Sequence, residues 1–193
     1  MVCERLAKPS KHQTPMKLIR HLLKKLIPRK MYRGLTSPYH YVISFLAALW
    51  YGFPSRHMFV IGVTGTKGKS STIELINAIL EEAGYKTALT NTIRFKIAEK
   101  SSPNRYKMTM PGRFFLQKFL AQAHSAGCKY VIIEMTSEGT LQYRHKWIAL
   151  DALVFTNIAR EHLESHGSFE NYLDAKLELV KSLKASKKRN KCL

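Results

Sequence analysis

The stretch "GVTGTKGKSST", residues 62–72, decides the fold class that we expect for this chain. It follows an apolar, β-branched run that begins at Met58, and it precedes a segment with helical apolar spacing. The common phosphate-binding loop has four residues between its first glycine and the Gly-Lys pair. Counted back from Gly68-Lys69, the first glycine would stand at position 63, which is Val63 here, whereas the glycines are Gly62 and Gly65. An ordinary glycine-rich turn is the alternative. The direct succession of strand, Gly-Lys-Ser and helix favours a phosphate site.

The residues of this loop suggest how it would bind a nucleotide. Gly65 and Gly68 let the backbone approach phosphate oxygens, and the following helix offers its N–H groups and its dipole. Lys69 would contact the β- and γ-phosphates, and the Ser70 hydroxyl would reach Mg²⁺.

Strands and helices alternate on both sides of the loop. Strands are expected at residues 58–64, 86–91, 129–135 and 152–157, and helices at 73–84, 111–127 and 168–183, the last with Ser168 as its N-cap. Residues 92–108 are polar and are expected to be irregular. This order predicts an α/β fold with a parallel sheet flanked by helices, in which ligands bind at the carboxyl ends of the strands.

Composition restricts the partners of the chain. Its 193 residues suffice for one domain with a sizeable core, and the net charge of +19 favours anionic partners such as a nucleotide, a nucleic acid or an acidic membrane surface. The three cysteines have no metal-binding spacing, which indicates a reduced, cytosolic chain. The basic residues cluster in the amino-terminal arm and the tail without a recognisable nucleic-acid reader motif, so nucleic acid is the least favoured partner.

The amino-terminal arm, residues 1–56, is expected to be separate from the globular domain, residues 57–193. Residues 17–26 read as a basic amphipathic helix that Pro28 ends. An apolar run without charged residues follows, but Pro38 and a turn at residues 52–54 leave only residues 39–53 uninterrupted, whereas a membrane span needs about 20. Its aromatic ends suit a membrane interface, so residues 17–53 are expected either to contact an anionic membrane or to pack on the globular domain.

Polar side chains follow two of the expected strands. Glu134 ends an apolar strand, where a buried carboxylate needs a partner, and in a nucleotide enzyme it is a natural Mg²⁺ ligand. His162 and His166 come after the strand at residues 152–157 and could turn toward the same edge. Taken alone, a solvated acid and structural histidines are the alternatives.

Four motifs together resemble the Mur ligase family, in its central ATP-binding domain of the P-loop NTPase type. They are "GVTGTKGKSST", "TMPGRFFLQ", "EMTSEGTLQYRHK" and "VFTNIAREHLESHGSFENYLDAK". The resemblance runs over about residues 58–180 and is greatest to the branch that adds the third residue to UDP-N-acetylmuramoyl-L-alanyl-D-glutamate. The first motif alone would also suit the related folylpolyglutamate synthases, whereas the last favours the muramyl-peptide branch.

The resemblance implies ATP-dependent amide formation in peptidoglycan precursor synthesis, through an acyl phosphate. It implies catalytic roles for Lys69, Glu134 and Lys176, with Lys176 carbamylated, whereas without the family a solvated helix lysine is the simpler interpretation. The implied ATP contacts are Gly65, Thr66, Lys67, Gly68, Lys69, Ser70, Ser71 and Asn157. The implied Mg²⁺ ligands are Ser70, Glu134, His162 and carbamylated Lys176. The implied contacts to the UDP-muramyl-peptide are Thr109, Met110, Thr136, Gln142 and Arg144.

This chain departs from the family pattern in ways that matter for function. Met110 stands where a threonine is usual, Thr136 replaces a serine, and Glu138 stands where many members have histidine. The family has three domains, and here the basic arm takes the place of the uridine-binding domain. The ATP-binding domain is expected to be incomplete at its C-terminal end, and a complementing chain could supply the missing domain.

Two other functions therefore remain open. One is a nucleotide-binding module without ligase activity, and the other is a folylpolyglutamate-synthase-like ligase. We expect a cytoplasmic location, with the arm peripheral at the inner face of the membrane.

Overall fold

A computed structural model describes residues 29–106, 108–159 and 167–186. Packing contacts divide the chain into two compact units, Met1–Pro38 and Tyr39–Leu193. The described part of the first unit is helical, and it belongs to helix α2, Arg29–Trp50. The expected amphipathic helix at residues 17–26 lies outside the described residues.

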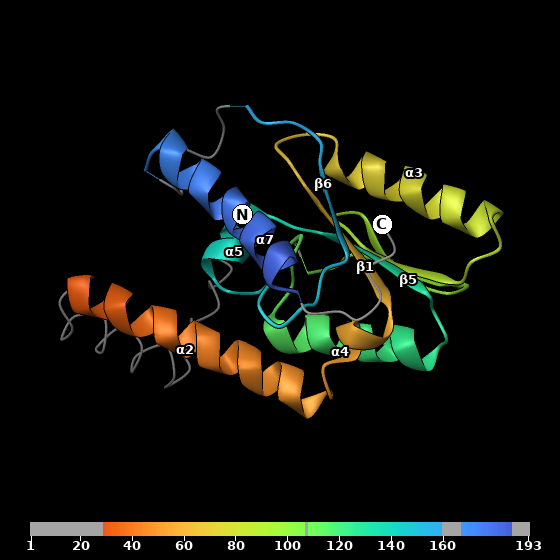
Figure 1. The fold of residues 1–193 in the computed structure, drawn as a ribbon, viewed down its shortest axis with the longest axis horizontal. Coiled ribbons are helices and arrows are strands. Elements are labelled where there is room, and N and C mark those ends of the chain that lie inside the picture. Colours follow the sequence, from red (N-terminus) through yellow and green to blue (C-terminus); the bar gives the residue numbers. More distant parts are fainter. Residues whose placement is uncertain (1–28, 107, 160–166, 187–193) are drawn as a thin grey trace, which may run out of the picture. The chain divides into compact units, whose positions relative to one another are not determined.

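The second unit is built on one six-stranded sheet with the strand order β4-β3-β2-β5-β1-β6 (Figure 1). Strands β2, β5, β1 and β6 are parallel, and β3 and β4 are antiparallel to their neighbours. The strands are β1 (Phe59–Thr64), β2 (Thr87–Thr90), β3 (Arg94–Ile97), β4 (Lys100–Pro103), β5 (Tyr130–Glu134) and β6 (Ala152–Phe155). The expected parallel α/β sheet is confirmed, with β1 in its interior.

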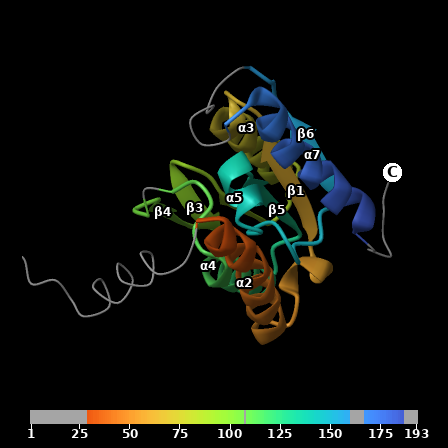
Figure 2. The same cartoon turned by 90° about the vertical axis from the view of Figure 1, so that its left-hand side faces the viewer.

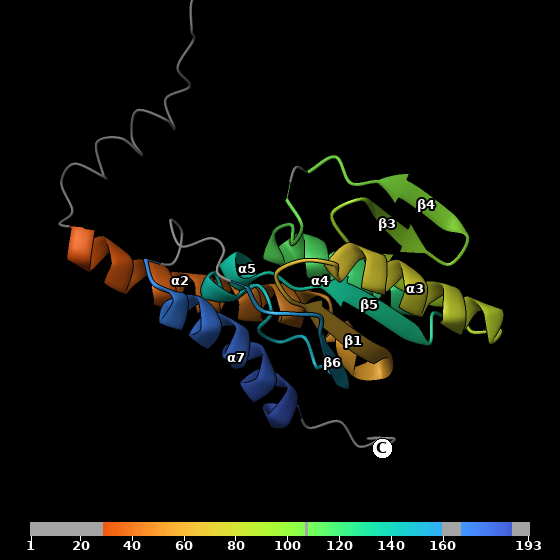
Figure 3. The ribbon, with the colours of Figure 1, turned by 90° about the horizontal axis from the view of Figure 1, so that it is seen from above.

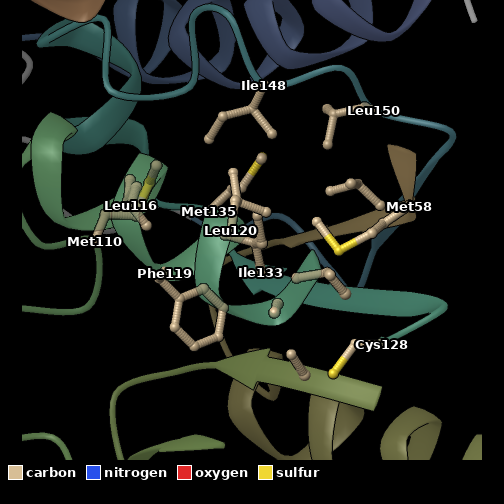
Figure 4. Packing of buried hydrophobic residues seen from close by; sticks show 14 of the residues in the cluster. Met58, Met110, Leu116, Phe119, Leu120, Cys128, Ile133, Met135, Ile148 and Leu150 are labelled. Atoms are coloured by element: carbon tan, nitrogen blue, oxygen red, sulfur yellow. The ribbon is translucent and has the colours of Figure 1, made fainter. Parts of the chain in front are cut away.

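Helices cover both faces of the sheet (Figures 2 and 3). After α2, the described residues of this unit form the helices η1 (Pro54–His57), α3 (Lys69–Glu82), α4 (Arg113–Ser125), α5 (Ser137–Leu141) and α7 (Phe169–Ala185). On one face, Ile73 of α3 packs on Val63 and Ile132 of the strands. On the other, Leu116 and Leu120 of α4 pack with Ile133, and Ile148 and Leu150 extend this core (Figure 4).

The expectation that residues 92–108 are irregular is wrong, because they contain strands β3 and β4. Phe95 is the buried residue of β3, and Ile97 packs partly buried against the same core. Arg94 forms an ion pair with Glu74, and Lys96 forms one with Glu81. All four residues of β4 are exposed. Apolar and charged residues alternate in β3, but only over residues 93–97, and β4 has no apolar face, so the hairpin has only a short periodic signal.

Helix α2 continues through Pro38, so the expectation that Pro38 interrupts the helix is also wrong. A proline removes one helical N–H donor, and a helix can continue through it at a cost. The expected turn is present, since Gly52 and Phe53 have left-handed φ angles of 68° and 51°. No helix in the described part of the chain is both long and apolar enough to cross a membrane.

Candidate active site

The loop between β1 and α3 has a backbone that requires glycine at two positions. Gly65 has φ 146° and Gly68 has φ 78°, values that residues with a side chain rarely adopt. A Cβ atom on Gly65 would lie 1.9 Å from Thr156 Oγ1, whereas one on Gly68 would meet no atom within 4 Å. The loop therefore packs tightly against the end of β6 at Gly65 and opens outward at Gly68.

Two residues that follow β6 hold this loop in place. Asn157 Oδ1 accepts hydrogen bonds from the N–H groups of Thr66 (3.2 Å) and Lys67 (3.0 Å). The Thr156 hydroxyl donates to the Lys67 carbonyl oxygen at 2.7 Å. Asn157, expected near the nucleotide, thus orders the loop in this structure.

Glu134 lies beside the start of the loop because the β1–β5 register pairs it with Val63. Its side chain is 2% exposed, and its Oε2 atom accepts hydrogen bonds from Ser70 Oγ at 2.9 Å and from the Thr92 N–H at 2.8 Å. The Thr92 hydroxyl donates to the same oxygen at 3.1 Å. These donors satisfy the buried carboxylate, which shares a hydrogen bond with the hydroxyl predicted to bind Mg²⁺.

Two lysine side chains approach the loop from different helices. Lys69 Nζ donates to the carbonyl oxygens of Gly65 (3.1 Å) and Thr66 (2.9 Å). Lys176 Nζ, on α7, donates to the Gly65 carbonyl oxygen at 2.9 Å and lies 3.4 Å from Thr64 Oγ1. Lys176 is 1% exposed, so it is not a solvated helix lysine. Burial, and secondarily the charge of Lys69, lower the pKa of Lys176 to about 8.

A cavity of about 180 Å³ joins these groups. Its lining comprises Gly65, Lys69, Thr92, Thr109, Glu134, Thr136, Ser137, Glu138, Tyr172 and Lys176. The three residues predicted to be catalytic therefore share one cavity with two of the predicted substrate contacts. A larger cavity of about 930 Å³ lies elsewhere, between the β3–β4 hairpin and α4.

All five predicted substrate contacts also interact with other parts of the protein. The Met110 side chain is buried in the core (Figure 4), and the Met110 carbonyl oxygen accepts a hydrogen bond from Arg144. Arg144 also donates to Gln142 Oε1 at 2.7 Å. Thr136 caps helix α5 by accepting from the Gly139 N–H at 3.1 Å, and Thr109 shares a 2.9 Å hydrogen bond with Thr92.

Four residues that line the cavity were not predicted as site residues: Thr92, Ser137, Glu138 and Tyr172. Thr92, which donates twice to Glu134, directly follows an expected strand end, and that position is its only sequence signal. Tyr172 shares a 2.9 Å hydrogen bond with Thr66 Oγ1, and only its helical spacing to Lys176 hints at a role. His162 and His166 lie outside the described residues, and the described ranges contain no group of three or more His, Cys, Asp or Glu residues that could hold a metal ion.

The strand, the glycine loop with its Gly-Lys-Ser end, the helix and the buried strand-end carboxylate make this an α/β domain of the phosphate-loop class. The model of the Mur ligase middle domain matches residues 63–189. The chain therefore belongs to the Mur ligase family.

Individual relatives agree with this assignment. The chain is 37% identical over 145 residues to the UDP-N-acetylmuramyl-tripeptide synthetase of Treponema pallidum, covering 74% of this chain and 27% of that protein. It is also 37% identical over 145 residues to the UDP-N-acetylmuramoyl-L-alanyl-D-glutamate–2,6-diaminopimelate ligase of Syntrophomonas wolfei, with coverages of 75% and 29%. The chain thus spans less than a third of the length of these curated relatives.

Solved structures are similar in fold. A UDP-N-acetylmuramoyl-L-alanyl-D-glutamate–2,6-diaminopimelate ligase superposes with a TM-score of 0.55 at 29% identity, covering 63% of this chain and 24% of that one. The E. coli FolC protein in complex with DHPP and ADP superposes with a TM-score of 0.51 at 22% identity, over 67% of this chain and 36% of that one. The second likeness concerns the fold alone.

Proposed function

We propose that this chain carries the ATP-binding part of an amide-bond ligase that extends UDP-N-acetylmuramoyl-L-alanyl-D-glutamate by one amino acid. The observation that carries the proposal is the 2.9 Å hydrogen bond between Ser70 and the buried Glu134, in a cavity that also contains Lys69 and Lys176. The choice of a muramyl peptide as substrate is supported by the relatives, whose names state that they act on muramyl peptides.

The residues fit Mg·ATP. Hard oxygen donors from Ser70 and Glu134 stand together, which suits Mg²⁺. Glycine at position 65 lets the loop lie directly against Thr156 at the end of β6, and the glycine backbone leaves its N–H groups accessible to phosphate oxygens. When bound, the metal would neutralise phosphate charge. The proposed contribution of His162 concerns a residue outside the described ranges.

The reaction has two displacement steps. An oxygen of the muramyl-peptide carboxylate attacks the γ-phosphorus of ATP, the bond to the bridging oxygen breaks, and ADP leaves with that electron pair. The amine of the incoming amino acid then attacks the acyl carbon, phosphate leaves, and the amine loses a proton. Both reactants of the first step are anions, so the Lys69 ammonium lowers its barrier by offsetting their repulsion.

Lys176 would act in this site as a carbamate. Carbon dioxide reacts with a neutral amine, and burial near Lys69 lowers the pKa of Lys176 to about 8, so much of it is neutral at mildly alkaline pH. The carbamate would replace a buried cation by an anionic oxygen ligand that could bind a metal ion near Glu134.

The described residues contain no evident selector for the incoming amino acid. We propose that a further domain or a complementing chain binds it, because the relatives are more than three times as long as the matched region. We also propose a cytoplasmic location, where ATP and UDP-linked precursors are available.

Two other functions make different predictions. A folylpolyglutamate-synthase-like ligase is favoured only by the fold likeness to FolC. A nucleotide-binding module without turnover would keep the loop and lack the reaction.

The test mixes the purified chain with Mg·ATP, the muramyl dipeptide and candidate amino acids, with and without the part of a relative that lies beyond the matched region. Phosphate release that requires the muramyl substrate supports the ligase, and loss of that release in Glu134→Gln ties it to this site. Nucleotide binding without turnover in every mixture supports the module. Release that requires a folate instead of the muramyl peptide overturns the proposed substrate.

A further inference from the structure

The second half of helix α2 exposes an apolar stripe. Trp50 is 80% exposed, Tyr39 59% and Leu49 54%, and Val42 and Leu46 are also exposed. At 100° per residue, these five positions fall within a narrow sector of the helix, so they form one continuous face. We call them the α2 stripe.

The opposite side of α2 packs on the domain, which leaves the α2 stripe facing outward. Ser44 is buried and donates hydrogen bonds to the carbonyl oxygens of His40 (2.8 Å) and Tyr143 (2.9 Å). Ala47 and Ala48 are fully buried, and the Phe45 ring lies 4.9 Å from the Trp147 ring. Because these contacts hold the helix, it cannot turn the α2 stripe inward without losing them.

The chemistry on both sides of the stripe identifies what would cover it. Residues 34–55 contain no Asp, Glu, Lys or Arg, whereas residues 1–33 contain ten Lys or Arg and a single acid, Glu4. Arg56 follows the helix, with its guanidinium carbon 4.4 Å from the centre of the Phe53 ring. An apolar face between positive segments matches an anionic bilayer, in which acyl chains take up the stripe and headgroups attract the cations.

The length of the apolar segment sets how the helix would meet the bilayer. No described helix meets the requirements for a membrane span. The α2 stripe has aromatic residues at both ends, Tyr39 and Trp50, and such rings favour the headgroup level. We propose that the α2 stripe docks this domain on the surface of an anionic membrane, with α2 lying in the plane of the interface.

Vesicle binding by the whole chain tests this proposal without nucleotide or muramyl substrate, so its outcome is independent of ligase activity. Vesicles of phosphatidylglycerol mixed with phosphatidylcholine are compared with phosphatidylcholine alone, by co-sedimentation and by tryptophan emission. We expect binding to the anionic vesicles only, weakening as salt rises. On binding, the tryptophan emission should shift to the blue as Trp50 leaves water. This shift should disappear in Trp50→Phe, although that variant should still bind the anionic vesicles.

The variant that tests the stripe is the double change Leu46→Gln, Leu49→Gln. Because glutamine adds no charge, any loss of binding comes from lost apolar contact and not from charge repulsion by the lipids. We expect the partition coefficient of the chain into anionic vesicles to fall by more than about tenfold. The matched control is Leu75→Gln, Ile79→Gln, which removes an exposed apolar pair from α3 and should bind as the unaltered chain does. Unchanged melting temperatures establish that both variants fold.

Three outcomes would overturn the proposal. The first is equal binding to neutral vesicles. The second is unchanged vesicle binding by the α2 variant. The third is a concentration-dependent dimer that the α2 variant abolishes, together with no vesicle binding, since the stripe would then be covered by a second copy of the chain.

Discussion

The ammonium groups of Lys69 and Lys176 donate hydrogen bonds to the same acceptor, the carbonyl oxygen of Gly65, at 3.1 and 2.9 Å. Two cations therefore meet at the point where the phosphate loop begins. Their mutual repulsion, added to burial, favours the neutral form of Lys176. An anion in the adjoining cavity would relieve this repulsion, which gives the cavity a preference for phosphate or carboxylate groups.

The first prediction concerns carbamate formation on Lys176. In ¹³C-labelled bicarbonate, a carbamate resonance should grow as the pH rises through about 8, because the neutral amine is the reactive form. It should be absent in Lys176→Ala and retained in Lys184→Ala, which removes an exposed lysine from the same helix. A resonance that persists in Lys176→Ala would assign the modification to another amine.

The Lys69 side chain should matter most for nucleotide affinity. Lys69→Ala removes a charge-assisted phosphate contact, so we expect Mg·ATP binding to weaken by roughly 1.5–3 kcal/mol. Calorimetric titration measures this, with Lys118→Ala, an exposed lysine of α4, as the control. Equal affinities of Lys69→Ala and the control would remove Lys69 from the site.

Gly65 should tolerate substitution far less than Gly84. In Gly65→Ala the new methyl group collides with Thr156 at an unfavourable φ, and we expect a loss of more than about 3 kcal/mol in the free energy of unfolding. In Gly84→Ala the φ of 80° is unfavourable too, but no atom lies within 4 Å, so the loss should be about 1–2 kcal/mol. Denaturant titration compares the two, and similar losses would mean that the loop lies away from Thr156.

His145 should make the domain sensitive to acid. Burial first, and then the charge of Lys146, lower the pKa of this histidine to about 4, although Glu178 opposes the shift. The unfolded chain takes up a proton below about pH 6.5 and the folded chain only near pH 4, so the free energy of unfolding should fall over that interval. The full loss is about 3 kcal/mol, since one pKa unit corresponds to about 1.4 kcal/mol.

The control for this titration replaces the histidine itself. His145→Leu should flatten the decline between pH 6.5 and 4 in denaturant titrations, while His124→Leu, which removes an exposed histidine, should retain it. A decline of equal size in His145→Leu would assign the acid sensitivity to other groups.

The sequence predicted the central strands, and it singled out six of the residues that line the cavity beside the loop, because these depend on local signals. The strand that ends at Glu134 is an unbroken apolar run, and the loop before α3 has glycines where the backbone needs them. The β3–β4 hairpin escaped prediction because its contacts lie outside its own short sequence: Phe95 packs in the core, and Arg94 forms an ion pair with Glu74 of α3.

The burial of Lys176 and the packing of Met110 show that the direction of a side chain could not be predicted from the sequence. Helical spacing aligned Lys176 with Tyr172, yet only the tertiary fold brings its amine to the Gly65 carbonyl oxygen. Met110 was expected to face a substrate from its motif position, whereas the structure buries its side chain among core residues. Motif position singled out both segments, and side-chain direction depended on tertiary contacts that no local pattern encodes.

The hydrogen bonds from Thr156 and Asn157 to the phosphate loop join two segments about 90 residues apart in sequence. Local opening of edge strand β6 must therefore break bonds in the loop, and a ligand that rigidifies the loop must slow that opening. Amide hydrogen exchange in β6 would then report nucleotide occupancy from outside the cavity. The amide hydrogens of β6 and of the loop should therefore exchange as one cooperative unit.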